Sequence, residues 1–563
     1  MNESNGLARE LGRAVLGVAL LAASAVAQET TRVSVGASGA EANGASSCSS
    51  AVISADGRLV AFVSDATNLV AGDSNGSMDA FVHDRATGTT ERVSVDSAGA
   101  QTLNSSSIDG IAISSDGRFV AFASNGSTLV ANDTNGGFDI FVRDRMAGTT
   151  ERVSIDSAGV EGDAGSFFPQ LSADGQVVAF ASYATNLDPT DSNGTTDVFV
   201  HDRTTGITTR VSKGIAGADA RDHCSLAALS ADGNVVAFES YADNLVGGDH
   251  NAANDIFVHD RATAVTSRVN VDSAGAEAIG DSEGASLSTD GQVIAFASDA
   301  QNLVAGDTNG GGDVFVHDRS TGRTERVSVG ANGAQADADS TAPSMSADGQ
   351  VVAFRSDATN LVAGDTNGTR DIFVHDRSNG ITGRASVDAT GAQGNGKCYT
   401  ASLAADGRAV AFYSGASNLV AGDTNATLDV FVHELCVDAT WSNYGAGFPG
   451  ANGIPTLVAQ ADPVLGATLA IDVGSSSNTT TLAWLLVGSA SAQLPMGKGG
   501  DLLVDVDFAL VLTLPSGGTT LFADVADDVA LCGIEFFAQA LELDAGAAKG
   551  VSSTPGLRLL LGR

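Results

Sequence analysis

The feature that most constrains the fold is a short signature that recurs seven times along the chain. It reads Ser-Ala-Asp-Gly in most copies, and successive copies are separated by 60 residues once and by 58 residues five times. A fixed period of this length indicates repeated structural units rather than one continuous core. The copies are Ser54–Gly57, Ser114–Gly117, Ser172–Gly175, Ser230–Gly233, Ser288–Gly291, Ser346–Gly349 and Ala404–Gly407.

Each copy belongs to the same series of strand-like runs. Strand A ends at the signature, strand B is an apolar run such as Val177–Phe180, strand C is a run such as Asp197–His201, and strand D is Arg-Val-Ser. Runs rich in β-branched and aromatic residues, separated by Asp-Gly and Asp-Arg-x-x-Gly turns, predict four antiparallel strands. Seven such units predict an all-β fold, a seven-bladed β-propeller.

The repeat begins and ends out of phase. An Arg-Val-Ser-Val run at Arg32–Val35 precedes the first strand A, whereas the seventh unit ends after Phe431–Glu434 without a strand D. The N-terminal strand is therefore predicted to pair with strand C of the seventh blade, near Asp429–His433. Such a closure removes the open sheet edge, which is otherwise a site of aggregation.

The units resemble the WD40-like propeller repeats of the TolB type. The residues that carry the resemblance are Ser346–Gly349, Val352–Phe354 and Asp371–Phe373, and the resemblance covers residues 30 to 435. Two features depart from the family pattern: Ala, Ser or Thr replaces Pro in the turn, and the loop between strands B and C is longer. The resemblance implies an interaction scaffold, although related propellers also serve as gates on peptidases.

The N-terminus has the pattern of a signal peptide. Arg9 and Arg13 precede the apolar run Ala14–Ala22, and Ala25–Ala27 forms a small-x-small cleavage site before Gln28. The apolar run is too short for a membrane span. Residues 1–27 are therefore predicted to be removed on export, which implies a periplasmic, cell-surface or extracellular protein.

Two further regions follow the predicted signal peptide. Residues 28–436 are expected to form the propeller, and residues 437–563 lose the repeat and become rich in Leu, Val, Gly and Ala. Strand-like runs at Thr468–Val473, Asp501–Asp505 and Leu557–Leu561 predict a small, β-sandwich-like C-terminal domain.

Charge restricts the partners. The formal net charge is -38, and phosphate recognition requires Lys and Arg residues that are scarce in this chain. The composition argues against nucleic acid and anionic lipid surfaces and favours cations or basic partners. A protein or glycan partner and a monomeric state are expected.

Every B–C loop contains the motif Asp-x-Asn-x-x-x-Asp. Two carboxylates and an amide oxygen in one turn suit calcium, which takes about 6 to 8 oxygen ligands. Alternatively, the Asp and Asn side chains cap their own backbone in an Asx-type turn. Both interpretations remain open from the sequence. The candidate ligands are Asp73, Asn75, Asp79, Asp133, Asn135, Asp139, Asp191, Asn193, Asp197, Asp249, Asn251, Asp255, Asp307, Asn309, Asp313, Asp365, Asn367, Asp371, Asp423, Asn425 and Asp429.

A histidine follows Phe-Val of strand C in six blades, and Arg143 takes its place in the second. Residues one blade apart cannot converge on one metal, so these histidines are expected to make hydrogen bonds between blades. They are His83, His201, His259, His317, His375 and His433.

The five cysteines suit an exported protein with disulfides. Cys48, Cys224 and Cys398 each lie six residues before a signature. Blades 1 and 7 are neighbours across the closure, which predicts a Cys48–Cys398 bridge and a free Cys224. Cys436 and Cys532 then remain for a bridge in the C-terminal domain. The alternative is that all these thiols are buried and unpaired.

The sequence favours a binding scaffold over an enzyme. The metalloprotease motif His-Glu-x-x-His is missing. The rival hypothesis is a carbohydrate hydrolase or lyase with paired carboxylates at the propeller axis. In either case the ligand is expected on the face that carries the B–C loops and the loops between strand D and the next strand A (the D–A loops). Acidic residues of the D–A loops are Glu161, Asp163, Asp222, Glu277, Asp281, Asp337 and Asp339.

Overall fold

The computed structural model describes residues 29–46, 51–102, 106–435, 439–464, 467–496, 501–525 and 534–562. The repeats form a compact unit over Glu29–Glu434, and a second compact unit begins at Leu435. The sequence places this boundary after residue 436. In the described part of the chain, no helical segment has the length and apolar character that crossing a bilayer requires.

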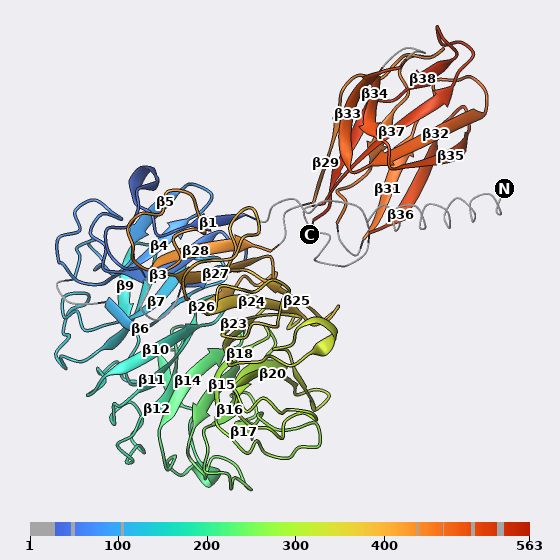
Figure 1. Cartoon of the computed structure of the whole chain (residues 1–563). Helices are drawn as coiled ribbons and strands as arrows, with labels where there is room; N and C mark the ends of the chain where they lie inside the picture. The colour runs from blue at the N-terminus through green and yellow to red at the C-terminus, as the bar shows by residue number, and fades with distance from the viewer. Residues whose placement is uncertain are drawn as a thin grey trace. The chain divides into compact units, whose positions relative to one another are not determined.

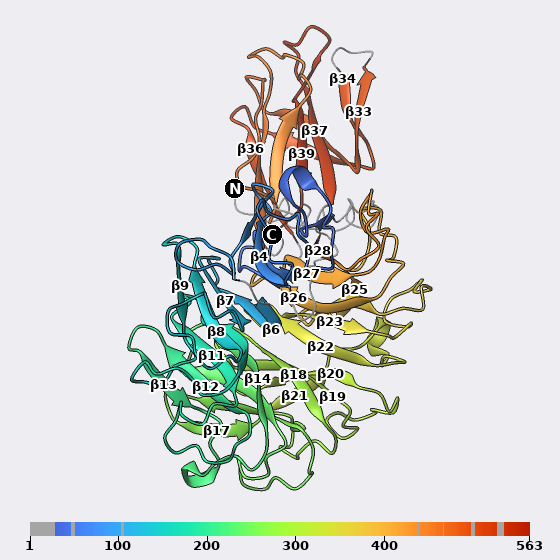
Figure 2. The same cartoon turned by 90° about the vertical axis from the view of Figure 1, so that its left-hand side faces the viewer.

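Seven four-stranded antiparallel sheets make up the described part of the repeat unit, and they follow one another around a ring (Figure 1). Their first strands lie nearest the centre in Figure 2. The chain is therefore a seven-bladed β-propeller, as predicted.

Blades 1 to 3 consist of β2 (Val52–Ile53), β3 (Leu59–Ser64), β4 (Asp79–Asp84) and β5 (Thr89–Arg92); β6 (Ser106–Ile113), β7 (Phe119–Ser124), β8 (Asp139–Asp144) and β9 (Thr149–Arg152); and β10 (Ser166–Leu171), β11 (Val177–Ser182), β12 (Asp197–Asp202) and β13 (Ile207–Arg210).

Blades 4 to 6 consist of β14 (Cys224–Leu229), β15 (Val235–Ser240), β16 (Asp255–Asp260) and β17 (Val265–Arg268); β18 (Ser282–Leu287), β19 (Val293–Ser298), β20 (Asp313–Asp318) and β21 (Arg323–Arg326); and β22 (Ser340–Met345), β23 (Val351–Ser356), β24 (Asp371–Asp376) and β25 (Ile381–Arg384).

Blade 7 combines the two ends of the repeat region. It contains β26 (Cys398–Leu403), β27 (Ala409–Ser414), β28 (Asp429–Glu434) and the N-terminal β1 (Thr30–Arg32). Strand β1 pairs antiparallel with β28, with Thr30 opposite His433 and Arg32 opposite Phe431. Figure 1 shows β1 beside β28. The predicted closure by the N-terminal strand is confirmed.

The recurring signature is a self-capped turn between strands A and B. In blade 3 the Ser172 hydroxyl donates to Asp174 at 2.7 Å and accepts from the backbone N–H of Val177 at 2.9 Å. Gly175 has a φ of +66°, and a Cβ there would lie 2.4 Å from the Phe119 ring of the preceding blade. The signature is therefore repeated because each of its residues is used inside the turn.

Apolar side chains of neighbouring blades form a shared core. One cluster joins Ala179, Val198 and Val200 of blade 3 to Val236 and Phe238 of blade 4. Within each blade the phenylalanines of strands B and C stack, as at Phe412 and Phe431, whose ring centroids are 5.9 Å apart. Short 3-10 turns lie in three D–A loops, at η1 (Ala37–Gly39), η2 (Ile215–Gly217) and η3 (Ala331–Gly333).

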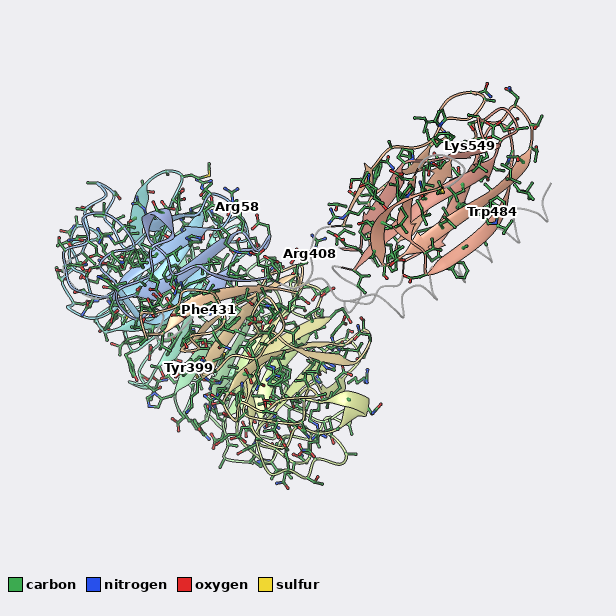
Figure 3. The ribbon with its side chains drawn as sticks, turned by 45° about the horizontal axis from the view of Figure 1, so that its top comes forward. Arg58, Tyr399, Arg408, Phe431, Trp484 and Lys549 are labelled. Atoms are coloured by element: carbon green, nitrogen blue, oxygen red, sulfur yellow. The ribbon has the colours of Figure 1, made fainter. Side chains whose placement is uncertain are left out.

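The C-terminal unit is a β-sandwich in its described residues. Its larger sheet has the order β29-β39-β37-β32-β35, with β38 also paired to β37, and a second sheet has the order β30-β31-β36. Both contribute to one core that includes Ile471, Leu485 and Leu557. Figure 3 labels Trp484 on β32. The strands are β29 (Thr440–Tyr444), β30 (Leu457–Ala459), β31 (Thr468–Val473), β32 (Thr481–Gly488), β33 (Ala490–Pro495), β34 (Asp501–Asp505), β35 (Phe508–Leu514), β36 (Thr519–Asp524), β37 (Glu535–Leu543), β38 (Val551–Ser553) and β39 (Gly556–Leu560).

Candidate functional site

Each Asp-x-Asn-x-x-x-Asp loop encloses a guanidinium group from strand D of its own blade. In blade 3, Arg210 lies 3.2 Å from Asp191 and 3.1 Å from Asp197. Its side chain is fully buried. The same ion pairs recur around the ring, so the positive charge between the two carboxylates is supplied by the protein itself. The seven arginines are Arg32, Arg92, Arg152, Arg210, Arg268, Arg326 and Arg384.

The remaining polar atoms of the motif make local hydrogen bonds. Asn193 donates to Asp197 at 3.0 Å and accepts from the N–H of Thr195 at 2.9 Å, which is an Asx-type turn. Ser212 of strand D donates to the other oxygen of Asp197 at 2.5 Å. With these partners in place, the donor set favours the turn interpretation, because few carboxylate lone pairs remain for a calcium ion.

Burial raises the pKa of several of these aspartates. Burial, together with the charge of Asp197, raises the pKa of Asp191 to about 6. Burial also raises the pKa of Asp139 to about 6. In blade 2, Asp133, Asp139 and Glu161 converge closely enough to share one ion, but Arg152 contacts all three, at 3.8, 3.5 and 2.8 Å.

The strand C histidines are part of hydrogen-bonded links between blades. Nδ1 of His201 lies 2.9 Å from the Thr208 hydroxyl, which donates to the carbonyl oxygen of Ile155 in the preceding blade at 2.5 Å. Because that hydroxyl proton is used, Nδ1–H of His201 is the donor to Thr208. Arg143 replaces histidine in blade 2 and donates to Thr150 at 3.1 Å. The predicted link between blades is therefore made by the threonine that the histidine contacts, and His201 itself bonds within its own blade.

Cys398 does not form the predicted disulfide with Cys48 in the structure. Cys398 is a buried, free thiol that lies 3.3 Å from the Ser414 hydroxyl. In blade 1 the equivalent contact, at 3.0 Å, joins Ser46 to Ser64, so Ser46 rather than Cys48 corresponds to Cys398. Ser46 lies eight residues before Ser54, whereas Cys398 lies six residues before Ala404, so counting back from the signature misaligns the two blades.

The other cysteines divide into two groups. Cys224 is free and buried, as predicted, and burial raises the pKa of its thiol to about 12. Cys48, Cys436 and Cys532 lie outside the described residues. The Cys436–Cys532 bridge therefore stays a prediction.

Most acidic side chains of the D–A loops cap neighbouring backbone. Glu161 accepts from the N–H of Thr134 at 2.9 Å, and Asp163 accepts from the N–H of Thr185 at 2.8 Å. Asp337 accepts in the same way from Thr359 at 2.7 Å. These carboxylates hold the loops of the face in place rather than presenting a set of open ligands.

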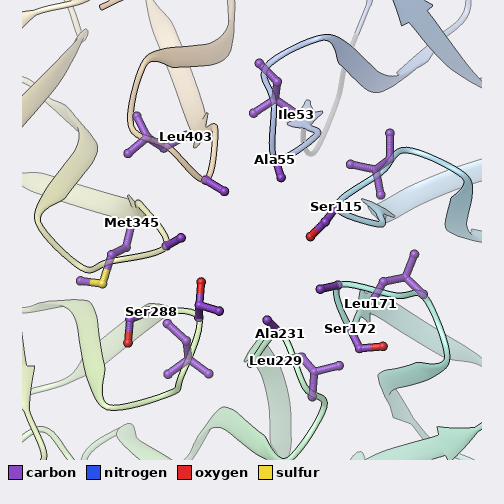
Figure 4. A pocket seen from close by; sticks show the side chains of 16 residues that line it. Ile53, Ala55, Ser115, Leu171, Ser172, Leu229, Ala231, Ser288, Met345 and Leu403 are labelled. Carbon is purple, nitrogen blue, oxygen red and sulfur yellow. The ribbon is translucent and has the colours of Figure 1, made fainter. Parts of the chain in front are cut away.

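At the axis, the A–B turns line a small uncharged opening. Its volume is about 190 Å³, and Figure 4 shows the seven turns around it. Backbone hydrogen bonds join successive turns, as from Ser115 N–H to the Ala173 carbonyl at 2.9 Å. None of the sixteen residues that line this opening is charged, so the paired carboxylates of the enzyme hypothesis do not lie here.

Blade-specific aromatic side chains gather at the opposite end, where strands A begin and strands B end. The Phe167 ring contacts Tyr183 edge to face at 6.2 Å, and Tyr183 contacts His223 of the next D–A loop at 6.2 Å. Phe168 has a φ of +52° within a β-bulge of β10. Such strained non-glycine residues often mark functional positions.

Two glutamates lie in the adjoining blades. Glu239, at the end of β15, reaches into blade 5 and accepts from the N–H of Gly284 at 3.2 Å. Burial, and then the nearby charge of Glu283, raise the pKa of Glu239. Partial desolvation and the carboxylates of Asp281, Glu239, Glu283 and Asp222 raise the pKa of the Tyr241 phenol. We name Phe168, Tyr183, His223, Glu239, Tyr241 and Glu283 the aromatic–acidic mouth.

Reasoning from the sequence singled out the neighbouring Asp222 and Asp281 of the D–A loops but missed the members of this group. The signal is a departure from the repeat once the blades are aligned by strand. Glu239 stands where blades 1, 2, 3 and 5 carry Val or Ala. Tyr183 and Tyr241 stand where blades 1, 5 and 6 carry Asp. Blades 6 and 7 also depart at this level, with Tyr399 (Figure 3) stacked on Tyr413 at 4.9 Å.

No protein-family model and no curated protein matches the sequence. Among solved structures, the chain is similar to a TolB from Agrobacterium tumefaciens, with 16% identity, a TM-score of 0.32 and coverage of 53% of this chain and 83% of the other. It is also similar to the WD40 repeats of RRP9, with 9% identity, a TM-score of 0.38 and coverage of 73% and 99%. A periplasmic gluconolactonase from Pseudomonas aeruginosa has 14% identity, a TM-score of 0.31 and coverage of 80% and 95%.

These neighbours carry the TolB and WD40 names that the repeat resembles. Their identities and TM-scores are low, so the propeller assignment rests on the strand pairing described above. The strand pairing defines the class of the protein: a β-propeller built from sequence repeats, followed along the chain by a β-sandwich unit.

Proposed function

We propose that this chain is an exported interaction scaffold whose ligand binds at the aromatic–acidic mouth. The observation that supports this function is a division of labour among the polar residues. The polar residues that are repeated in all or most blades form hydrogen bonds and ion pairs within turns, within loops and between blades. Exposed chemistry that belongs to single blades is concentrated at one mouth, on the face with the long loops.

Export is supported by residues 1–27, which have the charge, the apolar run and the small-x-small site of a signal peptide. Mass spectrometry of the protein secreted from a bacterial host tests this step. We expect the mature chain to begin at Gln28. An intact N-terminus in the cytoplasmic fraction would contradict it.

Binding is tested by applying the mature protein to arrays of glycans and of peptides of varied charge. We expect saturable binding to one class of ligand without release of product. A variant with Tyr183→Ala and Tyr241→Ala should lose that binding, whereas Tyr399→Ala, in another part of the ring, serves as the matched control. Equal binding by both variants would place the ligand site elsewhere.

A second candidate is a carbohydrate-active enzyme, and Glu239 with Glu283 is the observation that favours it. Burial raises the pKa of Glu239, and a carboxyl group with a raised pKa near a second carboxylate can serve as the acid of an acid–base pair. Turnover of any bound glycan, abolished by Glu239→Gln with binding retained, would support the enzyme over the scaffold.

A further inference from the structure

We propose that the aromatic–acidic mouth binds a basic segment of a partner protein, with one Lys or Arg side chain against the Tyr183 ring and another against the Tyr241 ring, beside Glu239 and Glu283. This inference rests on the proposed binding function and adds the position of the site and the chemistry of the partner.

The first observation is the exposure of large aromatic side chains on a propeller whose other phenylalanines are mostly buried. Phe168, Tyr183 and Tyr241 are 40%, 45% and 51% exposed. Tyr183 and Tyr241 occupy equivalent positions in adjacent blades, so their rings repeat at the spacing of one blade. Exposed aromatic groups on a rigid surface are typical of binding sites.

The aromatic side chains are held in place before any ligand arrives. Tyr183 is in contact with Phe167 on one side and with His223 on the other. Phe168 projects from a β-bulge that places its backbone in the left-handed region, and its ring lies 6.4 Å from that of Phe167. A platform that is already ordered loses little conformational entropy on binding.

The second observation is that the carboxylates of the mouth have no cationic partner. Among the described residues, no arginine or lysine forms an ion pair with Glu239 or Glu283, whereas every B–C loop carries its own arginine. Glu239 is half-buried, and its hydrogen-bond partners are the neutral N–H of Gly284 and the side chain of Asn254. A partly buried carboxylate without a counter-charge gains most from a ligand that supplies one.

Together these features select the chemistry of the ligand. A cation over the face of an aromatic ring is attracted by the ring, and nearby carboxylates add to that attraction. The net charge of -38 also steers basic molecules toward the protein. A neutral glycan would use the rings but leave Glu239 and Glu283 without a counter-charge, and a bare metal ion would not use the rings.

The test measures binding of a fluorescein-labelled peptide with four Lys-Gly repeats to the mature protein at low ionic strength. The same peptide with acetylated lysines is the neutral probe. Two double variants change the mouth, Glu239→Gln with Glu283→Gln and Tyr183→Ala with Tyr241→Ala. The matched control, Asp462→Asn with Asp505→Asn, removes the same charge from exposed positions of the C-terminal unit.

We expect both mouth variants to weaken binding of the lysine peptide by about tenfold or more, and the control by less than about twofold. Tyr183→Phe with Tyr241→Phe should retain most of the affinity, because the ring faces remain. Added salt should weaken binding of the lysine peptide.

Three results would overturn the inference. Equal losses in the mouth and control variants would show a non-specific charge effect. Equal binding of the acetylated peptide would show a surface for neutral ligands. Failure of the lysine peptide to bind would exclude the basic partner. In each case the array experiment still decides the proposed binding function, because any saturable ligand at the mouth supports it.

Discussion

The B–C loops and the aromatic–acidic mouth lie on the same face, and both are rich in carboxylates, but they differ in what neutralises the charge. In the loops a buried guanidinium lies between two aspartates, as Arg210 does between Asp191 and Asp197. At the mouth, Glu239 and Glu283 have no described ion pair. A high content of acidic residues therefore does not by itself locate a ligand site in this protein. The useful criterion is which carboxylates lack an arginine or lysine partner within the described residues.

The largest expected effect comes from removing a loop cation. Arg210→Met leaves buried aspartates without their partner, and we expect the free energy of unfolding to fall by about 3–5 kcal/mol. Urea denaturation measures the change. The control is Arg221→Met in blade 4, whose exposed side chain pairs with Asp243 at 3.0 Å and should contribute less than about 1 kcal/mol. Equal effects of the two substitutions would show that the loop arginines are not structural.

Acid should weaken the links between blades. Burial lowers the pKa of His433 to about 4, whereas the unfolded chain binds this proton below about 6.5. The stabilisation is therefore complete above pH 6.5 and is lost as the pH falls from 6.5 to 4.

Between pH 6.5 and pH 4 the free energy of unfolding should fall less in His433→Gln than in the parent protein, and we expect the difference to be about 3 kcal/mol. Denaturation of both proteins at several pH values checks this. Parallel pH profiles would contradict a neutral, buried His433.

The mouth should respond in the opposite direction. Because burial raises the pKa of Glu239, its contribution to stability is present below the unfolded value of 4.5 and is lost as the pH rises through the folded pKa. Glu239→Gln is expected to raise the free energy of unfolding at pH 8 by up to about 1 kcal/mol and to leave it unchanged at pH 4. Thermal unfolding at both pH values measures the change, with Asp505→Asn as the control. Destabilisation at pH 8 would indicate an internal partner for Glu239.

Calcium should have the smallest effect. A loop site occupied at 100 times its dissociation constant would add about 2.7 kcal/mol to the free energy of unfolding. Because the arginines already occupy the space between the carboxylates, we expect equal melting temperatures in calcium and in chelator. Asp313→Ala should destabilise the protein equally in both. If calcium raises the melting temperature of the parent protein but not that of Asp313→Ala, the loops bind calcium and the metal interpretation is correct.

The fold was largely predictable because the turn residues and strand-like runs that define a blade all lie within one repeat of the sequence. The Ser-x-Asp-Gly turns predict seven sheets. The extra strand D at the N-terminus and the missing strand D of the seventh unit predict the pairing of β1 with β28. The bulges were not predictable, because Phe168 and Ala342 adopt positive φ values without glycine. In blade 5 the equivalent position is Gly284, with a φ of +65°, so a glycine marks the bulge in some blades and not in others.

The candidate site was harder to predict than the fold. The loop motif indicates oxygen ligands for a cation. The cation found there is an arginine side chain from strand D, and in blade 3 this residue, Arg210, lies 13 residues after Asp197. Glu239 and Glu283 are 44 positions apart in the sequence. They lie near each other because strands of adjacent blades lie side by side, and Glu239 accepts from the N–H of Gly284, the residue after Glu283. Long-range proximity of this kind follows from the ring and cannot be seen in any single repeat.

The pairing of β1 with β28 also imposes an order on folding. Thr30 and His433 are separated by 403 residues, so the first strand made is the last to find its place. At a synthesis rate of about 5–20 residues per second, β1 waits roughly 20–80 s for its partner. During that interval blade 7 does not exist, and the ring has two open sheet edges. A protein that crosses a membrane unfolded and closes its ring only after the whole repeat region has emerged would avoid exposing these edges before export.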